Sequence, residues 1–138
     1  MKSQIFINLP VKDLARSFDF YTKMGFTNNP QFSDETAKCM VFSEEIFVML
    51  ITHDKFKTFI TKPITDVSKT TSALLSISVE SLDRVNEISD NAISAGGKEP
   101  IEAKDYGFMQ QRTIEDPDGH IWEIFYMDMT KFPQNPNE

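Results

Sequence analysis

Apolar and polar positions divide the first half of the chain into strand-like runs around one helical stripe. Residues 4–9 are rich in β-branched and aromatic side chains and end at Pro10, which predicts a strand. Asp13 is a favourable helix N-cap, and apolar residues recur after it at helical spacing until Gly25, where a helix should stop. Further strands are predicted at residues 26–32, 38–43 and 46–52, followed by a short amphipathic helix at residues 53–62.

The same order of elements returns in the second half of the chain. Residues 73–79 predict a strand, and Ser81 can cap a helix that stops at Gly96-Gly97. Three more strands are predicted at residues 98–103, 108–114 and 120–127. The sequence Asp116-Pro117-Asp118-Gly119 favours a tight turn before the last of them.

The repetition is visible in the residues as well as in the order of elements. Val11-Lys12-Asp13-Leu14-Ala15-Arg16 matches Val79-Glu80-Ser81-Leu82-Asp83-Arg84, in which a Val ends a strand and a capping residue, a Leu and an Arg follow. We therefore predict an α+β fold in which two βαβββ modules pair their curved mixed sheets around a cleft. Residues 1–128 would form one domain, with module one at 4–62, a linker at 63–71, module two at 72–128 and a C-terminal tail at 129–138.

Composition narrows the classes of partner. The net charge is −7 and the basic residues are scattered, which argues against a nucleic-acid partner. Cys39 is the single cysteine, so no internal disulfide can form. No apolar run approaches the roughly 20 residues that span a bilayer, and no apolar signal segment follows Met1. The chain is interpreted as a cytoplasmic protein without a membrane partner.

Three stretches resemble the vicinal oxygen chelate superfamily, which includes glyoxalase I, bleomycin resistance proteins and extradiol dioxygenases. They are the strand-helix opening at residues 8–26, Ala95-Gly96-Gly97 after the second helix, and the hairpin at residues 116–123. Residues 47–50 and 122–126 are further similar to a bacterial branch often labelled predicted lactoylglutathione lyase. The resemblance implies the fold predicted above, but it is unspecific for the reaction.

The resemblance also implies four inward positions that surround a divalent cation in metal-dependent members. Here these positions fall on Phe6, Leu74, Glu123 and Met49, the last of which a one-step slip would replace by Val48 or Leu50. Phe and Leu donate nothing to a metal, a thioether is a poor ligand for such an ion, and one carboxylate alone will not hold it. A slip of two residues brings in Asn8 or Ser76, but no His or Glu. No metal cofactor is therefore expected, and a divalent metal held by unexpected ligands is the alternative.

The two histidines are the obvious candidates for replacement ligands. His53 follows a predicted strand, and His120 follows the Asp118-Gly119 turn. We interpret both as surface or turn residues. In an unbroken strand His120 and Glu123 would point to opposite faces, which disfavours a shared metal.

Period-two alternation then predicts a cleft with apolar and aromatic walls and few polar groups. Its expected lining residues are Phe6, Asn8, Met49, Leu74, Ser76 and Phe125. Glu123 is the tentative catalytic residue, as a general base or hydrogen-bond anchor, unless it is a vestigial ion-paired carboxylate. Arg112, on the neighbouring strand, could pair with Glu123, bind an anionic ligand or form a structural salt bridge.

Three functions remain open from the sequence. The first is a metal-free protein that binds an apolar or aromatic small molecule in the cleft between the modules. The second is a metal-dependent lyase, isomerase or dioxygenase of the glyoxalase type, and the third is a metal-free enzyme that uses Glu123 as general base. The resemblance alone implies a homodimer, in many relatives with clefts completed across the interface.

Overall fold

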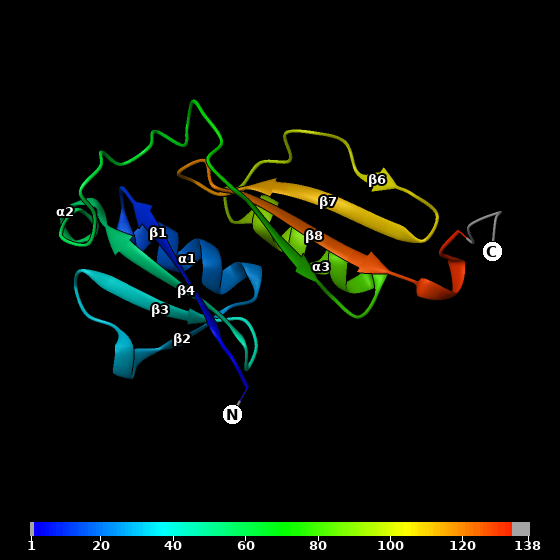
Figure 1. Cartoon of the computed structure of the whole chain (residues 1–138), viewed down its shortest axis with the longest axis horizontal. Coiled ribbons are helices and arrows are strands. Elements are labelled where there is room, and N and C mark those ends of the chain that lie inside the picture. Colours follow the sequence, from blue (N-terminus) through cyan, green and yellow to red (C-terminus); the bar gives the residue numbers. More distant parts are fainter. Residues whose placement is uncertain (1, 134–138) are drawn as a thin grey trace.

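A computed structural model describes residues 2–133 and contains two four-stranded mixed sheets. In Figure 1 the sheets lie side by side, and the long helix of each module lies behind its own sheet. Each half has the order β-α-β-β-β, with short helical turns added. The structure confirms the predicted α+β fold of repeated modules.

Module one builds its sheet in the order β1-β4-β3-β2. The outer strand β1 (Ile5–Val11) is parallel to β4 (Ile46–Thr52), whereas β3 (Ala37–Val41) and β2 (Thr27–Asn29) complete the sheet in antiparallel pairs. Helix α1 (Leu14–Met24) begins as predicted, because the Asp13 side chain accepts a hydrogen bond from the Arg16 N–H. It ends at Gly25, whose φ of 128° is costly for other residues.

Module two repeats this sheet as β5-β8-β7-β6. Strand β5 (Leu74–Ser78) is parallel to β8 (Ile121–Met127), and β7 (Met109–Glu115) and the two-residue β6 (Lys104–Asp105) follow in antiparallel pairs. Helix α3 (Leu82–Ser94) is capped by Ser81 in the same way as α1 is by Asp13. The duplicated sequence thus produces duplicated capping as well as duplicated topology.

Several predicted boundaries were wrong. Residues 98–103 form no strand, since only Lys98 makes an isolated bridge, to Glu115. The predicted strand at 26–32 is reduced to β2, because Pro30 opens a 3-10 turn, η1 (Pro30–Phe32). The predicted helix at 53–62 shortens to α2 (His53–Lys57). A second 3-10 turn, η2 (Met129–Lys131), lies in the predicted tail, of which residues 134–138 fall outside the described part of the chain.

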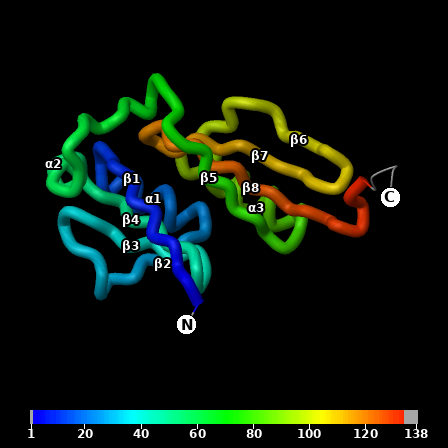
Figure 2. Tube along the Cα trace, in the orientation of Figure 1, coloured from blue at the N-terminus to red at the C-terminus, as the bar shows by residue number. Residues whose placement is uncertain are grey.

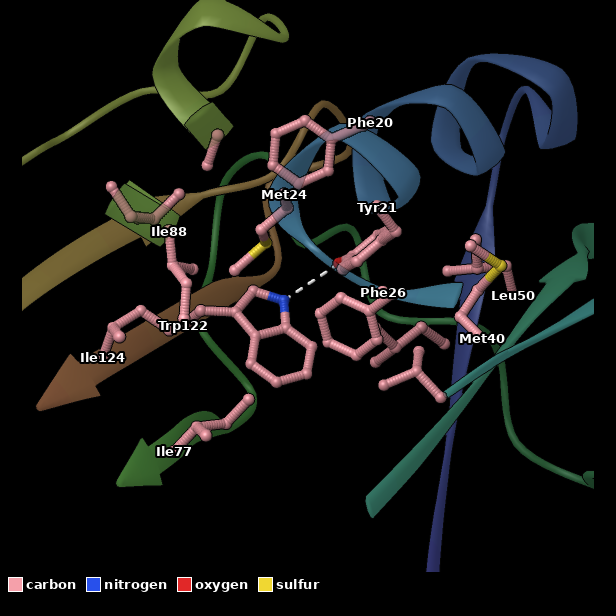
Figure 3. Packing of buried hydrophobic residues seen from close by; sticks show 14 of the residues in the cluster. Phe20, Tyr21, Met24, Phe26, Met40, Leu50, Ile77, Ile88, Trp122 and Ile124 are labelled. Carbon is pink, nitrogen blue, oxygen red and sulfur yellow. Dashed lines mark hydrogen bonds between the residues drawn. The ribbon is translucent and has the colours of Figure 1, made fainter. Parts of the chain in front are cut away.

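The two modules share one buried core between and beneath their helices. α1 contacts α3, whereas β1 and β5 meet little or not at all. Trp122 of β8 is completely buried and lies edge-on to Tyr21 of α1 and to Phe26, as Figure 3 shows. Burying an aromatic side chain of this size contributes about 2–3 kcal/mol, so this contact between modules is a major part of the core.

The turn between β7 and β8 joins the modules through a buried hydrogen-bond network. The Tyr21 hydroxyl donates to Asp116 Oδ2 at 2.5 Å and accepts from Trp122 Nε1 at 2.9 Å. Asp116 Oδ1 accepts from the backbone N–H groups of residues 118, 119 and 120 at 2.8–3.0 Å. Asp118 reaches across to module one, where it accepts from the Lys12 N–H and the Ser17 hydroxyl. This turn, predicted only as a chain reversal, therefore also links module two to module one. We call the hydrogen-bond network of Tyr21, Asp116, Asp118 and Trp122 the clamp.

Burial shifts the pKa values of two side chains in this clamp. It raises the pKa of Asp116, against the opposing influence of His120 and of the hydrogen bonds that the carboxylate accepts. Burial and the nearby Asp116 charge hold the pKa of Tyr21 well above its usual value. Among the described residues, no helix is long and apolar enough to cross a membrane.

Candidate small-molecule binding site

The helix-free face of module one is apolar and aromatic. Strand alternation turns Ile7, Leu9 and Val11 toward the helix, which leaves Phe6 and Asn8 on the opposite face. Phe6 stacks on Phe47 of β4, with ring centroids 4.5 Å apart and planes at 14°. Met49 is directly opposite Asn8 on the neighbouring strand and is half-buried. This face presents an aromatic platform with Asn8 as its only polar group on β1.

The corresponding face of module two carries a polar row across three strands. Ser76 of β5, Glu123 of β8 and Thr113 of β7 are cross-strand partners and therefore share one face of the sheet. The Ser76 hydroxyl donates to Glu123 Oε1 at 2.6 Å, and Gln111 Nε2 donates to Oε2 at 3.2 Å. Both carboxylate oxygens thus have a protein donor, which fixes the orientation of Glu123.

Apolar side chains flank this row on the same face. Leu74 and Ile121 form the pair on one side, and Phe125 lies opposite Ser78 and Gln111 on the other. Leu74 is 58% exposed and Phe6 of module one is 49% exposed, so both helix-free faces are open to solvent within one chain. The structure therefore places the predicted residues in two separate groups, one on the open face of each module.

Two members of the polar row were missed by the sequence analysis. Gln111 is a direct partner of Glu123, and Thr113 is 5% exposed with a hydroxyl that has no hydrogen-bond partner. A buried hydroxyl without a partner costs about 1–3 kcal/mol relative to a satisfied one. The register of β7 against β8 would have revealed both residues, but the sequence does not fix that register.

Arg112 does not lie beside Glu123. It is opposite Ile124 in the register, on the face of β7 that packs against the helix. Its guanidinium makes two hydrogen bonds to Glu99, at 2.8 and 3.0 Å, and one to Asp90 at 2.8 Å. The hydrogen bonds to Glu99 raise the pKa of Arg112 further, which keeps this group charged. Of the roles open to Arg112, the structure shows the salt bridge.

His120 is not a surface residue. It is 7% exposed directly before β8, and its Nε2 lies 2.9 Å from the Pro10 carbonyl oxygen of module one. It therefore belongs to the contact between modules rather than to the open face. His53 is half-buried at the first position of α2.

The donor set of the open faces does not fit a divalent cation. Phe6, Met49 and Leu74 supply no oxygen or nitrogen ligand, and the Glu123 oxygens already accept bonds from Ser76 and Gln111. Within residues 2–133, no group of three or more His, Cys, Asp or Glu side chains is arranged to hold a metal.

Residues 4–124 match the Glyoxalase/Bleomycin resistance protein/Dioxygenase superfamily, and the chain belongs to this family. No curated protein sequence matches it. Among solved structures, a hypothetical protein from S. aureus is 21% identical, with a TM-score of 0.75 and coverage of 91% of this chain and 94% of that chain.

Two further structures support the same fold. A glyoxalase-related enzyme from Fulvimarina pelagi is 21% identical, with a TM-score of 0.75 and coverage of 91% of this chain and 88% of that chain. A glyoxalase/bleomycin resistance protein/dioxygenase family enzyme from Burkholderia phytofirmans PsJN is 16% identical, with a TM-score of 0.73 and coverage of 91% and 99%. At these sequence identities the likeness shows the fold alone, and the activity has to be inferred from the residues of the site.

Proposed function

We propose that this protein binds a small apolar or aromatic molecule between the helix-free faces of its modules, without the metal ion of metal-dependent relatives. The observation that carries the proposal is the set of side chains at the four metal-ligand positions, of which only Glu123 can ligate a cation. Apolar walls with a few oriented polar groups are the usual composition of a small-molecule site. The stacked Phe6 and Phe47 rings favour a flat ligand.

Glu123 orients the ligand in this proposal. Since its carboxylate is held by Ser76 and Gln111, it can accept a further hydrogen bond from a hydroxyl, amide or ammonium group of the ligand. The ordered carboxylate also supports a second candidate, a metal-free enzyme in which Glu123 removes a proton from a carbon acid. Binding without turnover is the simpler function, because Ser76 and Gln111 donate to Glu123 itself rather than toward an enolate, and the polar row holds no cationic side chain.

A homodimer would complete the site. Each open face is a half-site, and β1 and β5 are sheet edges with exposed Ile5, Phe6 and Leu74. Exposed apolar edge strands are templates for pairing with another chain. We therefore propose that module one of one copy lies opposite module two of a second copy, with the ligand enclosed between them. The site is intracellular in this proposal, as the composition suggests.

A thermal-shift screen of apolar and aromatic metabolites tests the function. We expect compounds that combine a flat apolar body with a hydrogen-bond donor to raise the melting temperature of the wild type. They should stabilise Glu123→Gln less, and Arg112→Lys, altered on the opposite face, should respond like the wild type. A ligand that stabilises wild type and Glu123→Gln equally would contradict the assigned site. Turnover of a bound carbon acid that disappears in Glu123→Gln with binding intact would favour the enzyme.

A further inference from the structure

The linker between the modules borders two cavities that extend away from Glu123. Figure 2 shows the chain leaving α2 and arching over the gap between the sheets before it enters β5. Two cavities, of about 600 and 630 Å³, flank this arch, and residues 60–65 line both of them. Each volume lies within the range of about 300–1,000 Å³ that is typical of small-molecule sites.

One of the two cavities is mainly apolar. Its walls come from β1, α2, the segment between α2 and β5, β5 itself and the start of β8, and they include Phe56, Ile60, Ile64, Leu75 and Ile121. All five side chains are only half-buried, although they surround a common space. Filling that space with an apolar group would remove their exposed surface from water, which stabilises the complex by about 25 cal/mol per Å² of apolar surface buried.

The other cavity is basic. Lys12, Lys57 and Lys62 line it together with His53, against the carboxylates of Asp66 and Asp118. None of these lysines forms an ion pair in the described part of the chain. Asp118 is already engaged by the Lys12 N–H and the Ser17 hydroxyl. Three lysines against two carboxylates leave an excess of one positive charge in the lining, and Arg16 lies 3.7 Å from Asp118, so in a chain of net charge −7 this cavity favours an anion over a cation.

The linker between these cavities is held at one end. Packing of the turn at Gly119 against Val67 fixes it there, since a Cβ on Gly119 would lie 2.4 Å from the Val67 carbonyl oxygen. Lys62, by contrast, is exposed and lines both cavities. A ligand can therefore occupy the apolar cavity and place a charged group beside Lys62 in the basic one.

We propose that the two cavities lined by residues 60–65 form a second binding site, for a small amphipathic anion. Its apolar chain or ring enters the apolar cavity, and its carboxylate faces Lys57 and Lys62. The apolar volume supplies affinity, and the lysines select the sign of the charge. The lining of the apolar cavity includes Asn8 and Ile121 but not Glu123, Ser76 or Met49. The site thus meets the open faces at Asn8 and Ile121 but includes neither Glu123 nor its partner Ser76.

Octanoate, octan-1-ol and octylammonium test this proposal, because they share one chain and differ only in charge. Titration of the ¹⁵N-labelled full chain, followed by NMR, should give saturable shifts at residues 60–67 and Ala73 with octanoate. We expect octanoate to bind about tenfold more tightly than the alcohol, and the ammonium compound more weakly still. Equal affinities for the three compounds, or no saturable shift, would overturn the proposal. So would shifts confined to Glu123 and Phe125.

Variants separate the charge from the cavity. Lys62→Glu should weaken octanoate binding about tenfold, whereas Lys69→Glu, a matched reversal on the linker outside both cavities, should change it less than about twofold. Ala73→Trp places bulk at an exposed position of the apolar wall and should abolish binding of octanoate and octanol with the fold intact by circular dichroism. Glu123→Gln should leave octanoate binding unchanged. Unaltered binding in both Lys62→Glu and Ala73→Trp would refute the site.

Discussion

The two modules are copies in topology and opposites in the chemistry of their open faces. In module one, β1 and β4 present stacked Phe6 and Phe47 beside Met49. In module two, the equivalent strands β5 and β8 present Ser76 and Glu123, joined by a hydrogen bond. The helix-facing sides are similar by contrast, since each buries a continuous apolar stripe.

This difference shows which parts of a duplicated fold are free to diverge. The helix-facing sides must supply one shared core, so their volume and polarity are constrained by packing. The open faces contribute little to that core, and a change there costs little stability. One copy can thus become an aromatic platform while the other keeps a carboxylate, and a ligand between them meets two different walls.

The largest expected effect comes from breaking the clamp that fixes one module against the other. Asp116→Ala removes the acceptor of the Tyr21 hydroxyl and of three backbone N–H groups, all buried. We expect the free energy of unfolding to fall by about 3–5 kcal/mol in urea denaturation. Asp105→Ala, at an exposed carboxylate that accepts from Gly107 and Gln110, should cost less than about 1 kcal/mol. If Asp116→Ala loses no more stability than Asp105→Ala, the clamp does not stabilise the fold as we expect.

The next largest effect is expected on ligand binding at Glu123, on the open face of module two. Once a ligand has been found, Glu123→Gln should weaken its binding about tenfold, or 1.4 kcal/mol, because an oriented anionic acceptor is lost. The free energy of unfolding should change by less than about 1 kcal/mol, since Glu123 lies on an open face. Isothermal titration calorimetry measures the first quantity and urea denaturation the second. If Glu123→Gln lowers the free energy of unfolding without weakening ligand binding, the role of Glu123 is structural.

A smaller effect separates two buried hydroxyls. Thr113→Val replaces an unpartnered hydroxyl by a methyl group of similar shape, so we expect a gain in stability of about 1 kcal/mol. Ser17→Ala removes a hydroxyl that donates to Asp118 at 3.2 Å and should lower stability by about 1 kcal/mol. Thermal denaturation of both variants beside the wild type gives the two signs. A destabilised Thr113→Val would mean that this hydroxyl has a partner in solution.

The smallest effect is a pH dependence that originates in the clamp. Burial raises the pKa of Asp116 in the folded state above its unfolded value. The contribution of a group with a raised pKa is fully present below the unfolded pKa and is lost as pH rises through the folded pKa. Wild type should therefore gain stability relative to Asp116→Asn as pH falls through this range. Urea denaturation of both proteins at several pH values checks the sign, and a gap that narrows on acidification would contradict it.

The sequence predicted the features that depend on neighbouring residues. Asp13 and Ser81 cap helices because each side chain accepts from an N–H three residues further on, a purely local interaction. The repeated Val-to-Arg segment likewise revealed two modules, because both copies keep the same local signals. These features fixed the fold class and most helix and strand positions.

The candidate site was less accessible because it depends on contacts between distant residues. Arg112 and Glu123 lie on neighbouring strands, but only the register decides that Thr113, rather than Arg112, is opposite Glu123. His120 was interpreted as a surface or turn residue, and only its contact with Pro10, in the other module, explains its burial. Asp116 and Asp118 likewise appeared only as turn residues, because their partners on α1 are about 100 residues away.

The most direct test of metal-free binding is the metal content of the purified protein after incubation with Ni²⁺, Zn²⁺ or Fe²⁺ and dialysis. Measured by inductively coupled plasma mass spectrometry, wild type and Glu123→Gln should both retain far less than one equivalent of any of these ions, because three of the four ligand positions are Phe6, Met49 and Leu74. One tightly held equivalent in wild type that is lost in Glu123→Gln would contradict the account and assign the open faces to a metal centre.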